Sequence, residues 1–265
     1  MKTEIGIGIL DVYSNELLTE TISSIPEEYK ENVFIVSNKK HLKENQKNYT
    51  KQVSFATMRN YLISQMRIKN LKYYFILTSN VKIKDKNIFE NTINLAKTFG
   101  TWFITGAGSN NVPLEDDSVN LTLNLSPQLN TNFLFLYSGI IKNFGYFDER
   151  FYNTDNLDII DYINKMREKD VYPPKHYNPT IDKKYLEEYV SNIEKINFKE
   201  LPKSKEQYKP DDDKSLELSC AYFYHKYKYI PSQNDPNGVN QQILLEFMEK
   251  LQKTYGDKFH DNTKL

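Results

Sequence analysis

Between residues 5 and 106, short apolar runs alternate with longer segments of helical periodicity. The apolar runs, each of strand length, are residues 5–10, 33–36, 73–77 and 102–106. The helical segments are residues 16–25, 54–69 and 88–99, with Ser54 as a candidate N-cap of the second. Strands that alternate with helices of this length predict βαβ units, in which helices cover both faces of a parallel sheet. The sequence therefore predicts an α/β fold.

The pattern changes after residue 106. A polar loop follows, and residues 120–125 and 131–137 then alternate in polarity, which indicates antiparallel strands or a hairpin. We therefore expect a mixed sheet flanked by helices. In such a sheet the functional crevice lies outside the carboxyl ends of the parallel strands, so the residues that follow the first three apolar runs are candidates for a site.

The last third of the chain differs in composition. From about residue 171 it is rich in Pro, Lys, Tyr and Asp, and residues 184–196 and 239–255 have helical periodicity. We expect an α/β core over residues 1–170 and a C-terminal extension, mostly helix and loop, over residues 171–265.

Charge and cysteine content exclude several functional classes. Lys and Arg together number 35, as do Asp and Glu, so the overall balance does not favour a nucleic acid or an acidic membrane as partner. Cys220 is the only cysteine, which excludes an internal disulfide and fits a reducing compartment. The first apolar run is interrupted by Asp11 and is too short for a signal peptide, and no run reaches the ~20 apolar residues of a membrane span. We expect a soluble, cytoplasmic protein.

Residues 144–158 carry the densest set of candidate functional groups. Residues 144–151 combine a turn glycine with a cluster of aromatic and carboxylate side chains. Asp155 and Asp158 follow, three residues apart, at the entrance of the helical run 159–169. A carboxylate held at such a place can act as a general base. The structural alternative is that Asp155 caps the helix and that Asp158 interacts with the helix dipole.

Residues 144–158 resemble the "GGFDE-F…EDxD" segment of family 2 glycosyltransferases with the GT-A fold. Other segments resemble the family in the same order: residues 9–18 its first strand and donor loop, residues 34–38 its "IVVDNGS" strand, and residues 56–60 its "aaRN" helix. The resemblance implies a Rossmann-like nucleotide-diphospho-sugar transferase. Such an enzyme transfers a sugar, with inversion, from a nucleotide-sugar donor to an acceptor that the sequence does not identify.

The resemblance also implies roles for individual residues. Asp155 stands where the family has the acid that deprotonates the acceptor hydroxyl. Asp158 would orient that acid or cap the helix. The implied donor-binding residues are Leu10, Asp11, Ser37, Asn38, Arg59, Asn60, Thr78, Ser79 and Asn80. The implied acceptor-side residues are Ser138, Gly139, Phe147, Asp148 and Glu149. Of these, Asp148 and Glu149 are expected to brace the loop, and Ser138 with Gly139 either approaches the donor sugar or forms a plain turn.

This chain departs from the family pattern on the donor side. Ser37 replaces the aspartate that usually contacts the nucleobase, and residues 78–80 replace the metal-binding "DxD". Anionic oxygens hold Mg²⁺ or Mn²⁺ against a diphosphate, whereas hydroxyl and amide oxygens carry no charge. We therefore expect weak or no metal dependence, with Asn80 as a weak candidate ligand for Mn²⁺ or Mg²⁺. Lys82 or Lys84 is an alternative partner for the diphosphate.

Three functional hypotheses follow. The first is a glycosyltransferase with weak or no metal dependence. The second is a catalytically degenerate GT-A protein with a binding or scaffolding role, because both acidic donor-side positions are changed while the acceptor-side features are kept. The third, a protein directed to nucleic acid, has no support from net charge or from an aromatic and basic pattern.

Overall fold

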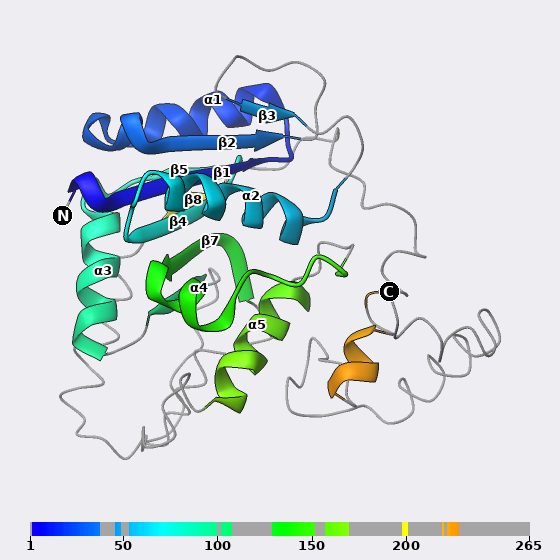
Figure 1. The fold of residues 1–265 in the computed structure, drawn as a ribbon. Helices are drawn as coiled ribbons and strands as arrows, with labels where there is room; N and C mark the ends of the chain where they lie inside the picture. Colours follow the sequence, from blue (N-terminus) through cyan, green and yellow to red (C-terminus); the bar gives the residue numbers. More distant parts are fainter. Residues whose placement is uncertain are drawn as a thin grey trace, which may run out of the picture.

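The computed structural model describes residues 2–37, 46–48, 53–99, 102–107, 129–151, 157–169, 198–200, 219 and 222–227. A six-stranded sheet with strand order β3-β2-β1-β4-β7-β6 forms the centre of this part of the chain (Figure 1). Its strands are β1 (Ile5–Asp11), β2 (Val33–Ser37), β3 (Gln46–Asn48), β4 (Tyr73–Thr78), β6 (Phe103–Ala107) and β7 (Leu129–Tyr137). Strands β1 to β4 pair in parallel, and β7 pairs antiparallel with both β4 and β6. The predicted mixed α/β sheet is confirmed.

Helices cover both faces of this sheet. Helices α1 (Asn15–Ser24) and α3 (Ile88–Phe99) pack on one face, and their apolar side chains share a core with Ile5, Ile7 and Ile9 of β1. Helices α2 (Phe55–Ile68), α4 (Ser138–Phe144) and α5 (Leu157–Glu168) pack on the other face. Successive strand residues point to opposite faces, so each strand contributes to both cores. Among the described residues, no helix is long and apolar enough to cross a membrane.

Two glycines of β1 allow α2 to lie close against the sheet. A Cβ at Gly6 would stand 2.9 Å from Met66 Cγ, and one at Gly8 would stand 2.8 Å from Met66 Cε. A larger side chain at either position would require the α2 side chains packed there, Met66 and Leu62, to shift. The same helix carries Arg59 and Asn60, so the glycines belong to the contact between β1 and the helix that bears these two polar side chains.

The helices and strands predicted for the described residues are confirmed within one or two positions. Ser54 caps α2, since its Oγ accepts a hydrogen bond of 3.1 Å from the backbone N–H of Thr57. Strand β3 and the two-stranded sheet of β5 (Val81–Ile83) and β8 (Phe198–Glu200) were not predicted from the sequence. The predicted segments 120–125, 184–196 and 239–255 lie outside the described residues, and the boundary near residue 170 stays a prediction.

The C-terminal third contacts the core at two described places. Strand β8 pairs antiparallel with β5, which follows β4 in the chain. The helical residues 222–227 pack near the start of α5, where Phe223 joins a small apolar cluster with Phe151 and Leu157. These described parts of the predicted extension are therefore packed against the α/β core.

Candidate functional site

The carboxyl ends of β1 and β4 meet where the strand order of the sheet changes direction. From β1 the chain crosses to β2 on one side, while β4 lies on the other side of β1. Loops that leave adjacent strands in opposite directions open a crevice, which is where ligands bind in doubly wound α/β sheets. The parallel register places Thr78 beside Leu10 and Ser37 beside Asp11. The structure therefore brings the donor-side residues predicted on these three strands to one edge of the sheet.

Asp11 and Ser37 form a buried pair at this edge. The Ser37 Oγ donates a hydrogen bond of 2.8 Å to Asp11 Oδ2, and neither residue is exposed to solvent. A carboxylate at the end of β1 thus stands next to the position where the resemblance would place an aspartate on β2. Asn38, which follows Ser37, lies outside the described residues.

Ser79, just after the end of β4, is hydrogen-bonded to the loop after β1. Its Oγ accepts hydrogen bonds from the backbone N–H groups of Val12 and Tyr13, each at 3.3 Å. Its own backbone N–H donates to the carbonyl oxygen of Leu10 at 3.0 Å. Ser79 thereby fixes the shape of the β1–α1 loop at the crevice.

Asn80 presents a buried amide at the same place. The Thr78 Oγ1 donates to Asn80 Oδ1, and both residues are buried. The Asn80 Nδ2 is also buried and has no hydrogen-bond partner among the described residues. An unpaired buried donor costs about 1–3 kcal/mol, so an oxygen acceptor at this place would be stabilising. Among the described residues, no group of three or more His, Cys, Asp or Glu side chains could hold a metal ion.

Arg59 of α2 and Asp158 of α5 form an ion pair in which each residue is only 1% exposed. The Arg59 Nη1 donates to Asp158 Oδ2. The guanidinium carbon also lies 5.5 Å from the ring centre of Phe55 and 5.8 Å from that of Phe147. Within the part of the chain that the structure describes, the Arg59 Nε and Nη2 and the Asp158 Oδ1 are buried without hydrogen-bond partners. This pair joins the N-terminal turns of two helices on the same face of the sheet.

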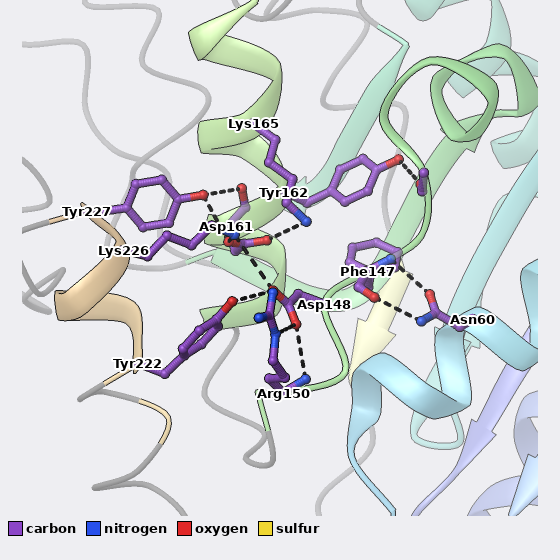
Figure 2. Close-up of polar contacts among 11 residues, drawn as sticks. Asn60, Phe147, Asp148, Arg150, Asp161, Tyr162, Lys165, Tyr222, Lys226 and Tyr227 are labelled. Atoms are coloured by element: carbon purple, nitrogen blue, oxygen red, sulfur yellow. Dashed lines mark hydrogen bonds and ion pairs between the residues drawn. The ribbon is translucent and has the colours of Figure 1, made fainter. Parts of the chain in front are cut away.

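Asn60 holds the loop before α5. Its Nδ2 donates to the carbonyl oxygen of Phe147 at 2.9 Å, and its Oδ1 accepts from the N–H of Phe147 at 2.9 Å (Figure 2). The Nδ2 also donates to Glu149 Oε1 at 2.8 Å. The resemblance implied that Arg59 and Asn60 bind the donor, but in the structure both side chains contact the segment predicted for the acceptor side.

Asp148 accepts side-chain hydrogen bonds from Arg150, which lies two residues later, and from Tyr222 in the last third of the chain. Arg150 donates through Nε and Nη2, at 2.8 and 2.7 Å, and the Tyr222 hydroxyl donates at 2.8 Å (Figure 2). Burial by itself would raise the pKa of Asp148, but the hydrogen bonds from Arg150 and Tyr222 outweigh it and hold that pKa well below its usual range. Burial and the Asp148 carboxylate raise the pKa of Tyr222. Asp148 is therefore a firmly ionised carboxylate whose contacts suit bracing.

Ser138 and Gly139 stand elsewhere. They begin α4 at the end of β7, and because β7 is antiparallel to β4, that end lies beside Tyr73, the first residue of β4. The Ser138 N–H donates to the carbonyl oxygen of Lys72 at 2.8 Å. At ~3.3 Å per strand residue, they are roughly 17 Å along β4 from Thr78. The structure thus does not bring Ser138 and Gly139 to the candidate site.

Of the two predicted catalytic acids, Asp155 lies outside the described residues, and Asp158 is the partner of Arg59. Asp161 was not predicted. It is fully buried on α5 and contacts Lys165, Lys226 and Tyr227. The sequence did contain a signal for Asp161. This acid lies three residues after Asp158 and next to Tyr162, so it interrupts the apolar residues of the helical run.

Comparisons with known proteins identify similar structures at low sequence identity. No family model matches the chain, and no curated protein matches it. S. aureus TarS 1-349 has a TM-score of 0.46 and 13% identity, over 96% of this chain and 73% of that chain. A cytidylyltransferase from Leptospira borgpetersenii serovar Hardjo-bovis (strain JB197) has a TM-score of 0.35 and 11% identity, over 95% of this chain and 94% of that chain.

A third solved structure is a glycosyltransferase involved in the glycosylation of the major capsid of PBCV-1. It has a TM-score of 0.34 and 16% identity, and the match covers 76% of this chain and 96% of that chain. All three TM-scores are low. Similarities of this size do not indicate the function of this chain.

Proposed function

We propose that this chain is a glycosyltransferase that holds a nucleotide-sugar at the carboxyl ends of β1, β2 and β4. The supporting observation is the gathering of buried polar side chains at the point where the strand order changes direction. Asp11 and Ser37 supply a carboxylate and a hydroxyl, and Asn80 supplies an amide N–H group that has no partner in the described ranges. Donors and acceptors of this kind suit the polar groups of a nucleotide.

The proposed reaction is an inverting transfer with Asp155 as general base. The Asp155 carboxylate takes the proton of an acceptor hydroxyl while the hydroxyl oxygen bonds to the anomeric carbon. The bond between that carbon and the diphosphate oxygen breaks, and the nucleoside diphosphate leaves with the electron pair. Asp158, paired with Arg59, would anchor the helix that follows Asp155. The acceptor is an unidentified hydroxyl compound.

The proposed transfer depends weakly or not at all on a metal ion. Residues 78–80 offer hydroxyl and amide groups but no carboxylate, so Mn²⁺ or Mg²⁺ would bind weakly there. The unpaired Nδ2 of Asn80 would instead donate a hydrogen bond to an oxygen of the donor. Such a hydrogen bond would stabilise negative charge that develops on the donor oxygen, and it requires no metal ion.

A donor panel tests this proposal. Purified protein is assayed for sugar transfer or donor hydrolysis with UDP-, GDP- and CDP-sugars, with Mn²⁺ or with EDTA. We expect turnover of one donor that changes by less than about tenfold when EDTA replaces Mn²⁺. Asp155→Asn should lower kcat by a factor of about 10² to 10⁴, whereas Glu31→Gln, at an exposed acid, serves as control. Unchanged turnover in Asp155→Asn would eliminate the proposed base.

The second candidate is a binding protein that has kept the fold and lost the chemistry. It is supported by residues 78–80, which lack a carboxylate, and by Ser79, whose hydroxyl already accepts two backbone N–H groups. Calorimetry separates the two candidates. Nucleotide-sugar binding without turnover of any donor in the panel would favour the binding protein, and turnover would exclude it.

A further inference from the structure

The helical residues 222–227 contact both sides of the segment that contains Asp155. Phe223 is fully buried and shares an apolar cluster with Phe151, just before that segment, and with Leu157, just after it. The ring centres of Phe223 and Phe151 are 6.1 Å apart, and those of Tyr222 and Phe151 are 5.0 Å apart. One short helical segment thus packs against both flanks of residues 152–156.

Lys226 also contacts both sides of the segment that contains Asp155, through ion pairs. Its Nζ contacts Asp161 Oδ1 on α5 and lies 3.7 Å from Asp148 Oδ2 in the loop before α5 (Figure 2). Asp161 has no exposed side-chain surface, and the Asp148 side chain is 7% exposed. Arg150 also pairs with Asp148 and Lys165 with Asp161, but Lys226 contacts both carboxylates. Removing its charge would increase the repulsion between the two carboxylates and weaken the link between the loop and α5.

Two tyrosine hydroxyls complete the contact. The Tyr222 hydroxyl donates to Asp148 Oδ2 at 2.8 Å, and the Tyr227 hydroxyl lies 2.9 Å from Asp161 Oδ1. The guanidinium carbon of Arg150 lies 4.6 Å from the ring centre of Tyr222. Residues 222–227 therefore hold the loop through Asp148 and hold α5 through Asp161.

We propose that residues 222–227 are a positioning element that fixes the flanks of the Asp155 segment, with Lys226 as the bridging residue. This inference rests on the proposed function, in which Asp155 removes a proton from the acceptor. A base must lie within hydrogen-bond reach of its proton, and a displacement of about 1 Å costs up to roughly 10² in rate. Lys226 acts through Asp148 and Asp161 and touches no reacting atom.

Lys165 provides a matched control. Lys165 and Lys226 both contact Asp161, and their side chains are 26% and 27% exposed. Lys165 lies on α5 itself, four residues after Asp161, so its ion pair joins no second element. Lys165→Met removes a cation from the same carboxylate without removing the bridge.

The first measurement, on the full chain, is amide hydrogen exchange, which needs no substrate. We expect Lys226→Met to speed exchange by about tenfold or more at residues 147–151 and 157–161, with β1 and β4 unchanged. Lys165→Met should leave the same amides near their wild-type rates, and Lys226→Arg should restore them, because a guanidinium can also bridge two carboxylates. Unchanged exchange in Lys226→Met would overturn the proposal.

The second measurement is steady-state kinetics with a donor that the panel identifies. We expect Lys226→Met to lower kcat about tenfold or more with the donor KM nearly unchanged, and Lys226→Arg to recover most of the loss. Faster exchange with an unchanged kcat would overturn the positioning role. Faster exchange in a protein that turns over no donor would support the bridge and count against the proposed function alone.

Discussion

The Arg59–Asp158 pair allows a quantitative test of the link between α2 and α5. Each residue is 1% exposed, so replacing Asp158 by Asn leaves a buried guanidinium without a counter-charge. Breaking a buried pair in this way costs about 3–5 kcal/mol. For a chain of this size that loss corresponds to a decrease in Tm of roughly 6–20 °C. We expect Arg59→Met to cost a similar amount, because it leaves the carboxylate unpaired.

The double variant should behave differently. In the native pair, the Arg59 Nε and Nη2 and the Asp158 Oδ1 have no hydrogen-bond partners among the residues that the structure describes, so desolvation of the charges is incompletely offset. Each such atom costs about 1–3 kcal/mol. Replacing both residues by apolar ones removes these costs together. Arg59→Met with Asp158→Leu is therefore expected to be as stable as wild type, or more stable by about 1–4 kcal/mol.

Urea unfolding followed by circular dichroism measures all four species of this double-mutant cycle. A second cycle on the exposed Glu27–Lys30 pair is the control, and we expect very little coupling there. The reasoning is refuted if Asp158→Asn costs less than about 1 kcal/mol. It is also refuted if the double variant loses as much stability as the two single variants combined.

Three further predictions concern the strand ends and the loop before α5. Gly8→Ala should cost about 1–3 kcal/mol in urea unfolding, because the new Cβ would stand 2.8 Å from Met66 Cε and 2.9 Å from Leu62 Cδ1, and an unchanged midpoint would contradict the close packing of α2. Asn80→Asp should lower the Tm without metal and recover it with Mn²⁺, since a buried carboxylate needs a cation, whereas the wild-type Tm should respond little to Mn²⁺. The pKa of Asp148 is lowered in the folded state, so its stabilising contribution is complete above the unfolded pKa of about 4 and is lost as the pH falls through the folded value. Asp148→Asn should therefore destabilise the protein most near pH 7 and by a smaller amount near pH 3, where the unfolded carboxyl is largely protonated while the folded one is still ionised. Equal losses at the two pH values would contradict this assignment.

Much of the fold follows from local patterns in the sequence. The strand near residues 73–77 and the helix that begins at Ser54 are confirmed because their periodicity and capping act over a few neighbouring residues. Strands β5 and β8 were not predicted, because each has three residues and its pairing joins segments more than a hundred positions apart. Such pairs leave no periodic signal in either segment.

Some residues of the candidate site could likewise be located from the sequence, and others could not. Asp11, Ser37 and Asn80 could be located from the sequence, since each follows or ends a predicted strand and parallel strands end at one edge. The placement of Ser138 could not, because it depends on β7 running antiparallel to β4, which carries the end of β7 to the other edge. The contacts of Arg59 and Asn60 were likewise hidden, since their partners are on segments about ninety or more positions later.

The sequence by itself determined the alternation of strands and helices, and with it the edge of the sheet where a ligand would lie. Hydrophobic periodicity is a local property, and it decides which face of each element is buried. Only the tertiary structure decided that Lys226 stands between Asp148 and Asp161, and that Arg59 faces Asp158. Those contacts depend on packing between elements distant in sequence. Burial removes water from these charged groups, so the loss of a partner would cost free energy.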